Sequence, residues 1–264
     1  MDYKFIACDS VIKKITRKDS LFHGSYCIDP YQNCEFGCQY CDSSFEKTVY
    51  IKKNITEVLE KELKTIKDGR MIIGSVNDPY QSIENKFKLT NAILEILKDH
   101  ELSCHILTKS PLILRDLPLL QQLECMVTIS LSSLNDQVVH IFEPGVPAPS
   151  ARLQTVQNLR NHEIHAGVAL IPLLPYIVEP EIESIVQAAA NVKAQYLLHK
   201  HLELKGDQER HFRNLIKQYY PHLLPKYDAL YEDDFNPRKE YLQEVHALLQ
   251  HQCKKYNISD RITL

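Results

Sequence analysis

The chain has 264 residues, 44% of them hydrophobic and 25% charged, which is ordinary for a folded protein and excludes general disorder. Its formal charge of -3 gives no overall attraction to phosphate backbones or anionic lipid, so nucleic acid is not supported as a partner, although a local basic groove is not excluded. The amino-terminal residues lack a basic stretch followed by an apolar run, and the most apolar later segment, at 166–178, is interrupted by Pro172 and Pro175. We therefore expect a cytoplasmic protein without a membrane partner.

Short apolar runs alternate with amphipathic stretches between residues 24 and 199. The runs indicate buried strands of a parallel sheet, because such strands are apolar on both faces. They lie at 24–28, 71–76, 103–108, 125–131, 165–171 and 195–199. The stretches between them have helical spacing of apolar residues, which predicts helices at 55–68, 89–99, 112–123, 150–161 and 180–191. Asn54 and Glu57 add a capping signal to the first helix.

Strands that alternate with helices indicate a parallel sheet wound right-handedly. Six such units are too few to close a (β/α)8 barrel, so the sequence predicts an open partial (β/α)6 barrel of the α/β class over residues 1–204. From residue 205 the pattern changes to helices near 208–219 and 238–256, separated by a connection rich in Pro and Asp. We expect residues 205–264 to form a helical extension that packs on the barrel.

Cysteines crowd into one short segment after the first predicted strand. Cys34, Cys38 and Cys41 have Cys-x3-Cys-x2-Cys spacing, with the aromatic Tyr40 before the last cysteine. Three thiolates at this spacing suit three irons of a [4Fe-4S] cluster and leave the fourth iron open, while Gly37 gives the loop a permissive backbone. The placement puts the segment at the carboxyl-terminal mouth of the barrel, where active sites of this architecture lie.

A structural zinc site is the main alternative for these cysteines. Zinc normally takes four protein ligands, and the nearby candidates for the fourth are Cys27 and His23. The spacing of the three cysteines favours the cluster over zinc.

This motif resembles that of the radical S-adenosylmethionine (SAM) superfamily. The resemblance implies that SAM binds to the open iron and that its reductive cleavage gives a 5′-deoxyadenosyl radical, which abstracts a hydrogen atom from a substrate. It also implies an external one-electron reductant such as flavodoxin or ferredoxin. Tyr40 would then lie against the adenine, and its backbone would read the adenine edge.

Further segments resemble the spore photoproduct lyase branch of that superfamily. They are Gly74–Tyr80 (GSVNDPY), Leu107–Ser110 (LTKS), Thr128–Leu131 (TISL), Phe142–Gly145 (FEPG) and Ala151–Leu153 (ARL). The resemblance implies polar contacts to SAM from Asn77, Lys109 and Ser130, each at the end of a predicted strand. Of these, Lys109 would be an awkward core residue without a ligand.

Ser75 marks a departure from that branch. In spore photoproduct lyase a cysteine at this position returns a hydrogen atom to the product radical, and an alkyl O–H bond is too strong for that purpose. We therefore expect that the DNA lesion is not the substrate, unless Cys104, Cys125 or a tyrosine substitutes. We keep Ser75 as a candidate cofactor-binding residue.

Two further groups of residues are candidates with competing interpretations. Glu143 and Arg152 either form a buried ion pair, which we favour, or Arg152 reaches the SAM carboxylate. His199 and His201 flank the end of the sixth strand, where they are candidates for lining a substrate cavity. We expect Cys104 and Cys125 to be buried core thiols.

The sequence therefore predicts a radical SAM enzyme, of lyase or oxidoreductase type, with an unidentified substrate. The alternatives are a DNA- or RNA-acting enzyme like spore photoproduct lyase, and a non-catalytic metal-binding interaction protein.

Overall fold

A computed structural model describes residues 1–232 and 234–263 of the chain. Its main sheet has the strand order β10-β9-β8-β7-β6-β3-β2, and every pairing from β3 to β10 is parallel. The strands are β2 (Lys13–Lys14), β3 (Tyr26–Ile28), β6 (Met71–Ile73), β7 (Cys104–Thr108), β8 (Cys125–Ser130), β9 (His165–Leu173) and β10 (Leu197–His201). Because β2 and β10 are the two edges, the barrel is open, and the prediction of a partial (β/α)6 barrel is confirmed.

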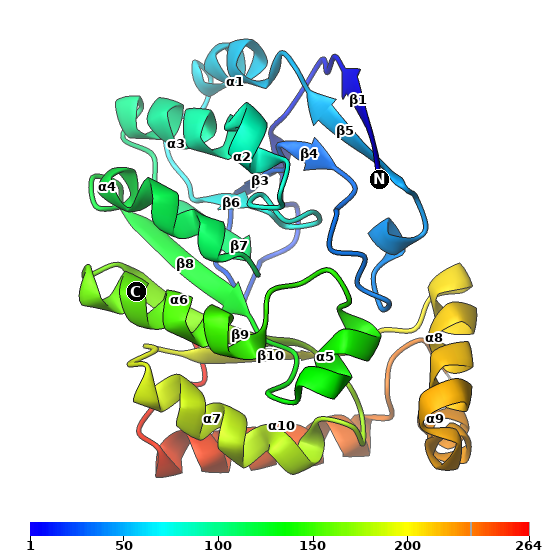
Figure 1. The fold of residues 1–264 in the computed structure, drawn as a ribbon. Helices are drawn as coiled ribbons and strands as arrows, with labels where there is room; N and C mark the ends of the chain where they lie inside the picture. Colours follow the sequence, from blue (N-terminus) through cyan, green and yellow to red (C-terminus); the bar gives the residue numbers. More distant parts are fainter. Residues whose placement is uncertain (233, 264) are drawn as a thin grey trace.

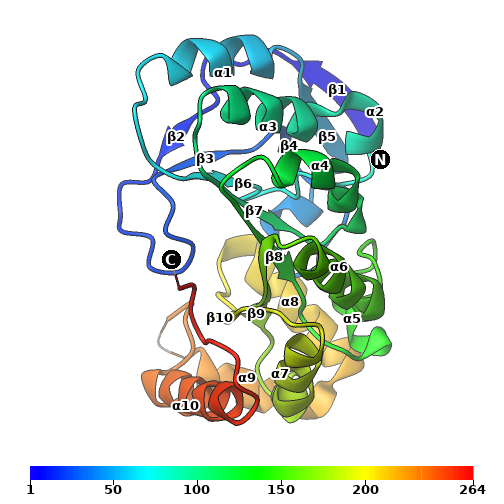
Figure 2. The ribbon, with the colours of Figure 1, turned by 90° about the vertical axis from the view of Figure 1, so that its left-hand side faces the viewer.

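Helices cover the outer face of this sheet, as Figures 1 and 2 show. They are α1 (Ile55–Leu63), α2 (Glu84–Phe87), α3 (Leu89–Asp99), α4 (Leu117–Leu120), α5 (Asp136–Phe142), α6 (Pro149–Asn161) and α7 (Ile182–Asn191). In α1 the buried residues Ile55, Leu59 and Leu63 recur at helical spacing, so one stripe of the helix faces the core. The main hydrophobic core therefore lies between helices and sheet.

The inner face of the sheet is different in character. Along β8, Val127 and Ile129 belong to the core beneath the helices, whereas Thr128 and Ser130, on the opposite pleat, line a central cavity. The open side of the barrel is filled by Phe22, from the loop before β3, and by Ile262, near the carboxyl terminus, in a small apolar cluster. Ser259 also pairs with Tyr196 just before β10. Segments from both ends of the chain thus close the barrel laterally.

The structure has a second, three-stranded sheet that the sequence analysis missed. It contains β1 (Asp2–Ile6), β5 (Thr48–Lys52) and β4 (Tyr31–Gln32), in the order β1-β5-β4. Alternation of buried and half-buried residues in β5 was the signal for it, since Val49 and Ile51 are buried and their neighbours are not. The antiparallel pair of β4 and β5 holds both ends of the cysteine segment.

Several helix predictions need correction. The helix expected at 112–123 is a 3-10 turn over Pro111–Asp116 followed by the short α4, because Pro111 and Pro118 each start a new helical segment. Helix α5 was not predicted, although the Asn135 side chain caps it by accepting from the Gln137 amide. No helix in the described ranges is long and apolar enough to cross a membrane.

The carboxyl-terminal third forms α8 (Gly206–Tyr219), α9 (Leu224–Leu230) and α10 (Lys239–Lys255). Phe212 of α8 and Leu249 of α10 belong to the same buried cluster as the barrel residues, and α10 packs on α7. The division of the chain at residue 205, with residues 205–264 as an extension on the barrel, stays a prediction.

Candidate active site

A cavity of about 210 Å³ opens at the carboxyl ends of the parallel strands. The cysteine segment contributes Cys34, Phe36, Gly37, Cys38, Tyr40 and Cys41 to its lining. The strand ends contribute Gly74, Ser75, Val76, Asp78, Lys109, Ser130, Ala169 and Ile171, and the deeper part is lined by Phe22, Leu107 and Thr128. This is the end of a partial barrel at which ligands bind.

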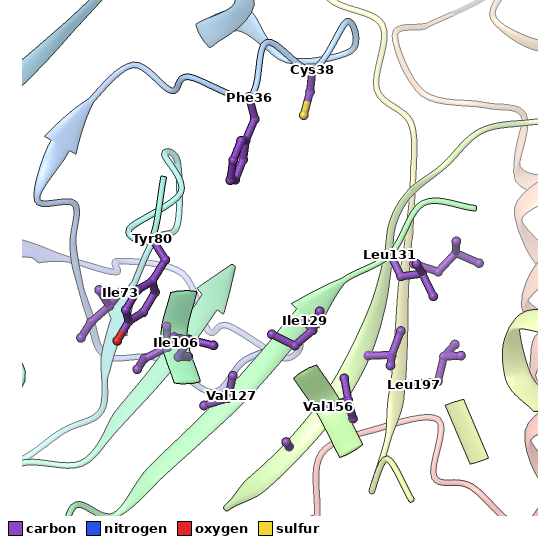
Figure 3. Packing of buried hydrophobic residues seen from close by; sticks show 14 of the residues in the cluster. Phe36, Cys38, Ile73, Tyr80, Ile106, Val127, Ile129, Leu131, Val156 and Leu197 are labelled. Atoms are coloured by element: carbon purple, nitrogen blue, oxygen red, sulfur yellow. The ribbon is translucent and has the colours of Figure 1, made fainter. Parts of the chain in front are cut away.

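The cysteine loop lies over the strand ends and is anchored through its backbone. The Gln39 amide donates to the Phe142 carbonyl at 2.8 Å, and the Gly145 amide donates to the Phe36 carbonyl at 3.1 Å. A Cβ atom at Gly145 would lie 2.8 Å from the Phe36 oxygen, so glycine is required for this close approach. Figure 3 shows the Phe36 and Cys38 side chains projecting from the loop toward the ends of β7 and β8.

The three cysteines fit the cluster that their spacing predicts. Burial raises the pKa of the Cys34 and Cys38 thiols to about 12, and the neighbouring Lys109 charge lowers both. A buried thiol of this kind becomes a thiolate when a bound cation supplies the compensating charge. Three cysteines that line one cavity are residues of the kind that would hold a [4Fe-4S] cluster with one open iron.

Lys109 presents a cation to the same cavity. Burial alone would lower the pKa of its ammonium group, but the Cys38, Glu143 and Asp78 groups nearby raise it above the ordinary value. In the described part of the chain, no hydrogen bond or ion pair engages the ammonium group. The neighbouring charges favour the cation, but its buried N–H donors have no acceptor, which indicates that a ligand group that accepts hydrogen bonds belongs here.

Asp78 is a cavity residue that the sequence analysis did not single out. Its carboxylate accepts hydrogen bonds from the Thr108 hydroxyl at 2.6 Å, the Lys109 amide at 2.7 Å and the Tyr80 amide at 2.9 Å. Burial raises the pKa of this carboxyl group. Asp78 thereby ties the loop after β6 to the end of β7 and fixes the backbone of Lys109.

Ser75 and Asn77 both follow β6 but have different surroundings. Ser75 lines the cavity and donates to the Asp29 carboxylate at 3.2 Å. Asn77 is absent from the lining, and its side chain donates to the Tyr31 carbonyl and accepts from the Ser43 hydroxyl. Its contact with SAM stays a prediction, since the amide is engaged by the chain itself.

Arg152 and Glu143 form the buried ion pair that the sequence analysis favoured. The Arg152 Nη1 and Glu143 Oε2 atoms are 2.8 Å apart, and both side chains are 0% exposed. The same nitrogen donates to the Ser130 carbonyl at 3.1 Å, and the Tyr40 hydroxyl donates to the Glu143 carboxylate. The pair therefore connects the cysteine loop to the end of β8 from behind the cavity wall, while Ser130 and Tyr40 themselves face the cavity.

Helix α8 reaches the cysteine loop from the outside. The Gln208 amide donates to the Tyr40 carbonyl, and His211 Nε2 lies 2.6 Å from the Gln39 side-chain oxygen. The rings of Phe45 and His211 meet edge to face with centroids 5.3 Å apart. No sequence motif marked these residues, because the contacts join segments far apart in the chain.

His199 and His201 are not part of the cavity, which corrects that prediction. The Nε2 atom of His199 is 3.3 Å from His246 Nδ1, and His201 is bonded to Asn236 at 3.0 Å. Both histidines lie on the edge strand β10, whose end faces the carboxyl-terminal helices. Cys104 and Cys125 are buried in neighbouring strands, as expected.

Comparisons with known proteins agree with this geometry. The family model described as "Radical SAM superfamily" matches residues 28–189. An uncharacterized protein of Methanocaldococcus jannaschii is 30% identical over 208 residues, which cover 74% of this chain and 76% of that protein. An uncharacterized protein of Mycobacterium tuberculosis is 27% identical over 247 residues, which cover 86% of this chain and 72% of that protein.

Solved structures share the fold at low sequence identity. Spore photoproduct lyase complexed with dinucleoside spore photoproduct superposes with a TM-score of 0.68 at 15% identity, covering 96% of this chain and 79% of the lyase. Streptococcus suis SuiB bound to S-adenosylmethionine gives a TM-score of 0.56 at 15% identity, covering 76% of this chain and 47% of SuiB. With the family match over residues 28–189, these findings show that the chain belongs to the radical SAM superfamily.

Proposed function

We propose that this chain holds a [4Fe-4S] cluster on Cys34, Cys38 and Cys41 and cleaves SAM reductively, so that the resulting radical abstracts a hydrogen atom from an organic substrate. The observation that supports the proposal is one cavity that Cys34, Cys38, Cys41 and Lys109 line together. When bound, the cluster would supply the electron for the cleavage, which it receives from an external donor such as flavodoxin or ferredoxin.

The residues of the chain bind and orient SAM in this proposal. Lys109 pairs with the SAM carboxylate, since its ammonium group is the cation of the cavity that has no partner of its own. Ser75 and Ser130 offer hydroxyl groups to the polar parts of SAM, and Tyr40 provides a ring face. Asn77 and Arg152 support the wall from behind, where their bonds to the chain hold them.

Anaerobic reconstitution followed by metal analysis tests the cofactor. We expect about four irons and four sulfides per chain, and with dithionite and SAM the formation of 5′-deoxyadenosine and methionine. Cys38→Ala should abolish both the cluster and the products, whereas Cys253→Ala, a buried cysteine of α10, should retain them. One tightly held zinc per chain, or a reducible cluster that gives neither product, would contradict the proposal and favour the non-catalytic alternative.

The reaction type and substrate are a separate question. At the position of Ser75, the resemblance to spore photoproduct lyase implies a cysteine in that enzyme. In this chain the Ser75 hydroxyl donates to the Asp29 carboxylate. We therefore expect no repair of the dinucleoside spore photoproduct by the reconstituted protein. Rapid repair would instead favour the DNA- or RNA-acting alternative.

A further inference from the structure

The floor of the cavity has a polar centre that the proposed SAM site does not use. Thr128 is 1% exposed, and its hydroxyl oxygen lies 2.7 Å from His105 Nε2 and 2.8 Å from the Tyr196 hydroxyl. His105 and Tyr196 are both 0% exposed and do not line the cavity, whereas Thr128 does. Thr128 is thus the point at which a buried polar network reaches the cavity.

The backbone carbonyls at the ends of this network can only accept, and they set the directions of its hydrogen bonds. The Phe22 carbonyl lies 3.3 Å from His105 Nδ1 and is an acceptor, so Nδ1 carries the proton of the neutral ring and Nε2 accepts. The Thr128 hydroxyl therefore donates to Nε2. The Tyr196 hydroxyl lies 2.8 Å from the Thr128 oxygen and donates to the Val127 carbonyl at 3.1 Å, so with Thr128 already donating to His105 its single hydrogen is shared between these two acceptors. A hydroxyl oxygen has two acceptor sites, so one site on Thr128 is left for a ligand donor.

The surroundings of Thr128 are apolar and uncharged. Phe22 and Leu107 line this deeper part of the cavity, and Ala169 and Ile171 line the wall at and beyond the level of Ser130. Burial lowers the pKa of His105 to about 4, so its ring is neutral near neutral pH. The charged groups of the cavity lie above this floor. Lys109 directly follows β7, and Asp78 lies in the loop after β6. A charged ligand group would find no counterion at the floor.

The residues around the floor are closely packed and held by hydrogen bonds. A Cβ atom at Gly167 of β9 would lie 2.3 Å from the Tyr196 ring, so the missing side chain makes the room in which that ring lies. The loop that carries Phe22 is fixed by Asp19, whose carboxylate accepts from the amides of Leu21, Phe22 and Gly24 at 3.0, 3.0 and 3.1 Å. The ring of Phe22 meets that of His105 edge to face at 5.3 Å. The position and direction of the Thr128 hydroxyl are therefore fixed before any ligand binds.

We propose that this floor, formed by Thr128, Phe22 and Leu107, is the substrate subsite, and that it takes an uncharged, apolar moiety bearing one O–H or N–H donor bonded to Thr128. The inference rests on the proposed function in that SAM is expected to fill the polar part of the cavity above. The single fixed acceptor selects for the donor, since a group without one leaves a buried lone pair unsatisfied.

Two matched fluorinated probes test the subsite on the reconstituted, SAM-bound protein. 4-Fluorophenol and 4-fluorotoluene differ by a hydroxyl in place of a methyl group, and ¹⁹F NMR titration gives the affinity of each. We expect the ratio of phenol to toluene affinity to fall about tenfold in Thr128→Val and to be retained in Thr128→Ser. Thr155→Val, which removes another buried threonine hydroxyl on α6, is the matched control and should leave the ratio unchanged.

A second variant keeps the test decisive if Thr128→Val fails to fold. Phe22→Ala removes an apolar ring of the floor itself, and it should weaken both probes by a similar factor. The proposal is overturned by an unchanged ratio in folded Thr128→Val, by unchanged probe affinity in Phe22→Ala, or by probes that bind the SAM-free protein but not the SAM-bound protein, which would assign the floor to SAM itself. SAM cleavage is measured on the same samples, so absence of 5′-deoxyadenosine would defeat the proposed function without affecting the probe result.

Discussion

The mouth and the floor of the same cavity are built in different ways. At the mouth, charged and sulfur-bearing residues follow directly after strands, and buried ion pairs hold them, as with Arg152 and Glu143. At the floor, neutral side chains from separate strands and a distant loop share hydrogen bonds around Thr128. The residues proposed for the radical chemistry thus belong to sequence motifs, whereas those proposed for ligand selection are brought together only by the folded chain.

The largest effect should come from breaking the ion pair behind the mouth. Arg152→Met leaves the Glu143 carboxylate buried without its counterion, which should lower the free energy of unfolding by about 3–5 kcal/mol. Urea denaturation followed by circular dichroism measures the change. The double variant Arg152→Met/Glu143→Gln removes both charges of the pair, so it should recover most of the lost free energy of unfolding.

The exposed pair of Arg210 and Asp207 is the control for that experiment. Its side chains are 79% and 83% exposed, so Arg210→Met should leave the unfolding midpoint nearly unchanged. Equal losses in Arg152→Met and Arg210→Met would show that the buried pair does not hold the mouth.

At the floor, His105 should make the free energy of unfolding fall at acid pH. Its folded pKa of about 4 lies below the ordinary value of 6.5, so the unfolded chain binds the proton more readily. The contribution of His105 to stability is complete above pH 6.5 and is lost as pH falls from 6.5 to about 4, by up to about 3 kcal/mol. His105→Gln should flatten the dependence of the unfolding free energy on pH in this range.

A second histidine separates stability from ligand selection. Burial also lowers the pKa of His199 to about 4, but this residue lies away from the cavity. His199→Gln should flatten the pH dependence as well, yet only His105→Gln should change the affinity ratio of the two fluorinated probes. A changed ratio in His199→Gln would break the distinction between the floor and the rest of the molecule.

Lys109 is the test of ligand binding at the mouth. Lys109→Gln removes the cation that is expected to pair with the SAM carboxylate, and equilibrium dialysis should show SAM affinity reduced about ten- to a hundredfold. Lys61→Gln, an exposed lysine of α1, is the control, and probe affinity at the floor should persist in both variants. Undiminished SAM affinity in Lys109→Gln would remove Lys109 from the proposed site.

The fold could be predicted where the local sequence carries a pattern, and not where distant segments meet. Buried parallel strands are continuous apolar runs, so β7 and β8 were predicted to within a residue or two at each end. The small sheet was missed because β1 is mostly exposed and carries no buried stripe. Loops and short strands depend on contacts with distant segments, which the local pattern does not contain.

The candidate site shows the same limit. The spacing of Cys34, Cys38 and Cys41 and the position of Lys109 after a strand pointed to the residues that line the mouth. Asp78 was overlooked beside Asn77, since both are polar residues after β6 and only the fold shows which one lines the cavity. Phe22 lies in a loop without periodicity, and its place on the floor depends on Asp19 and on the open side of the barrel.

The smallest expected effect is also the most specific to the floor. Tyr196→Phe keeps the ring that fills the space above Gly167 and removes only the hydroxyl, which should lower the free energy of unfolding by about 1 kcal/mol. Thr128 would still donate to His105, and its oxygen would have both acceptor sites open. The preference for 4-fluorophenol should therefore persist or rise in Tyr196→Phe, as ¹⁹F NMR would show. Its loss would mean that Tyr196, rather than Thr128, presents the bonding group, because the two variants would then act alike.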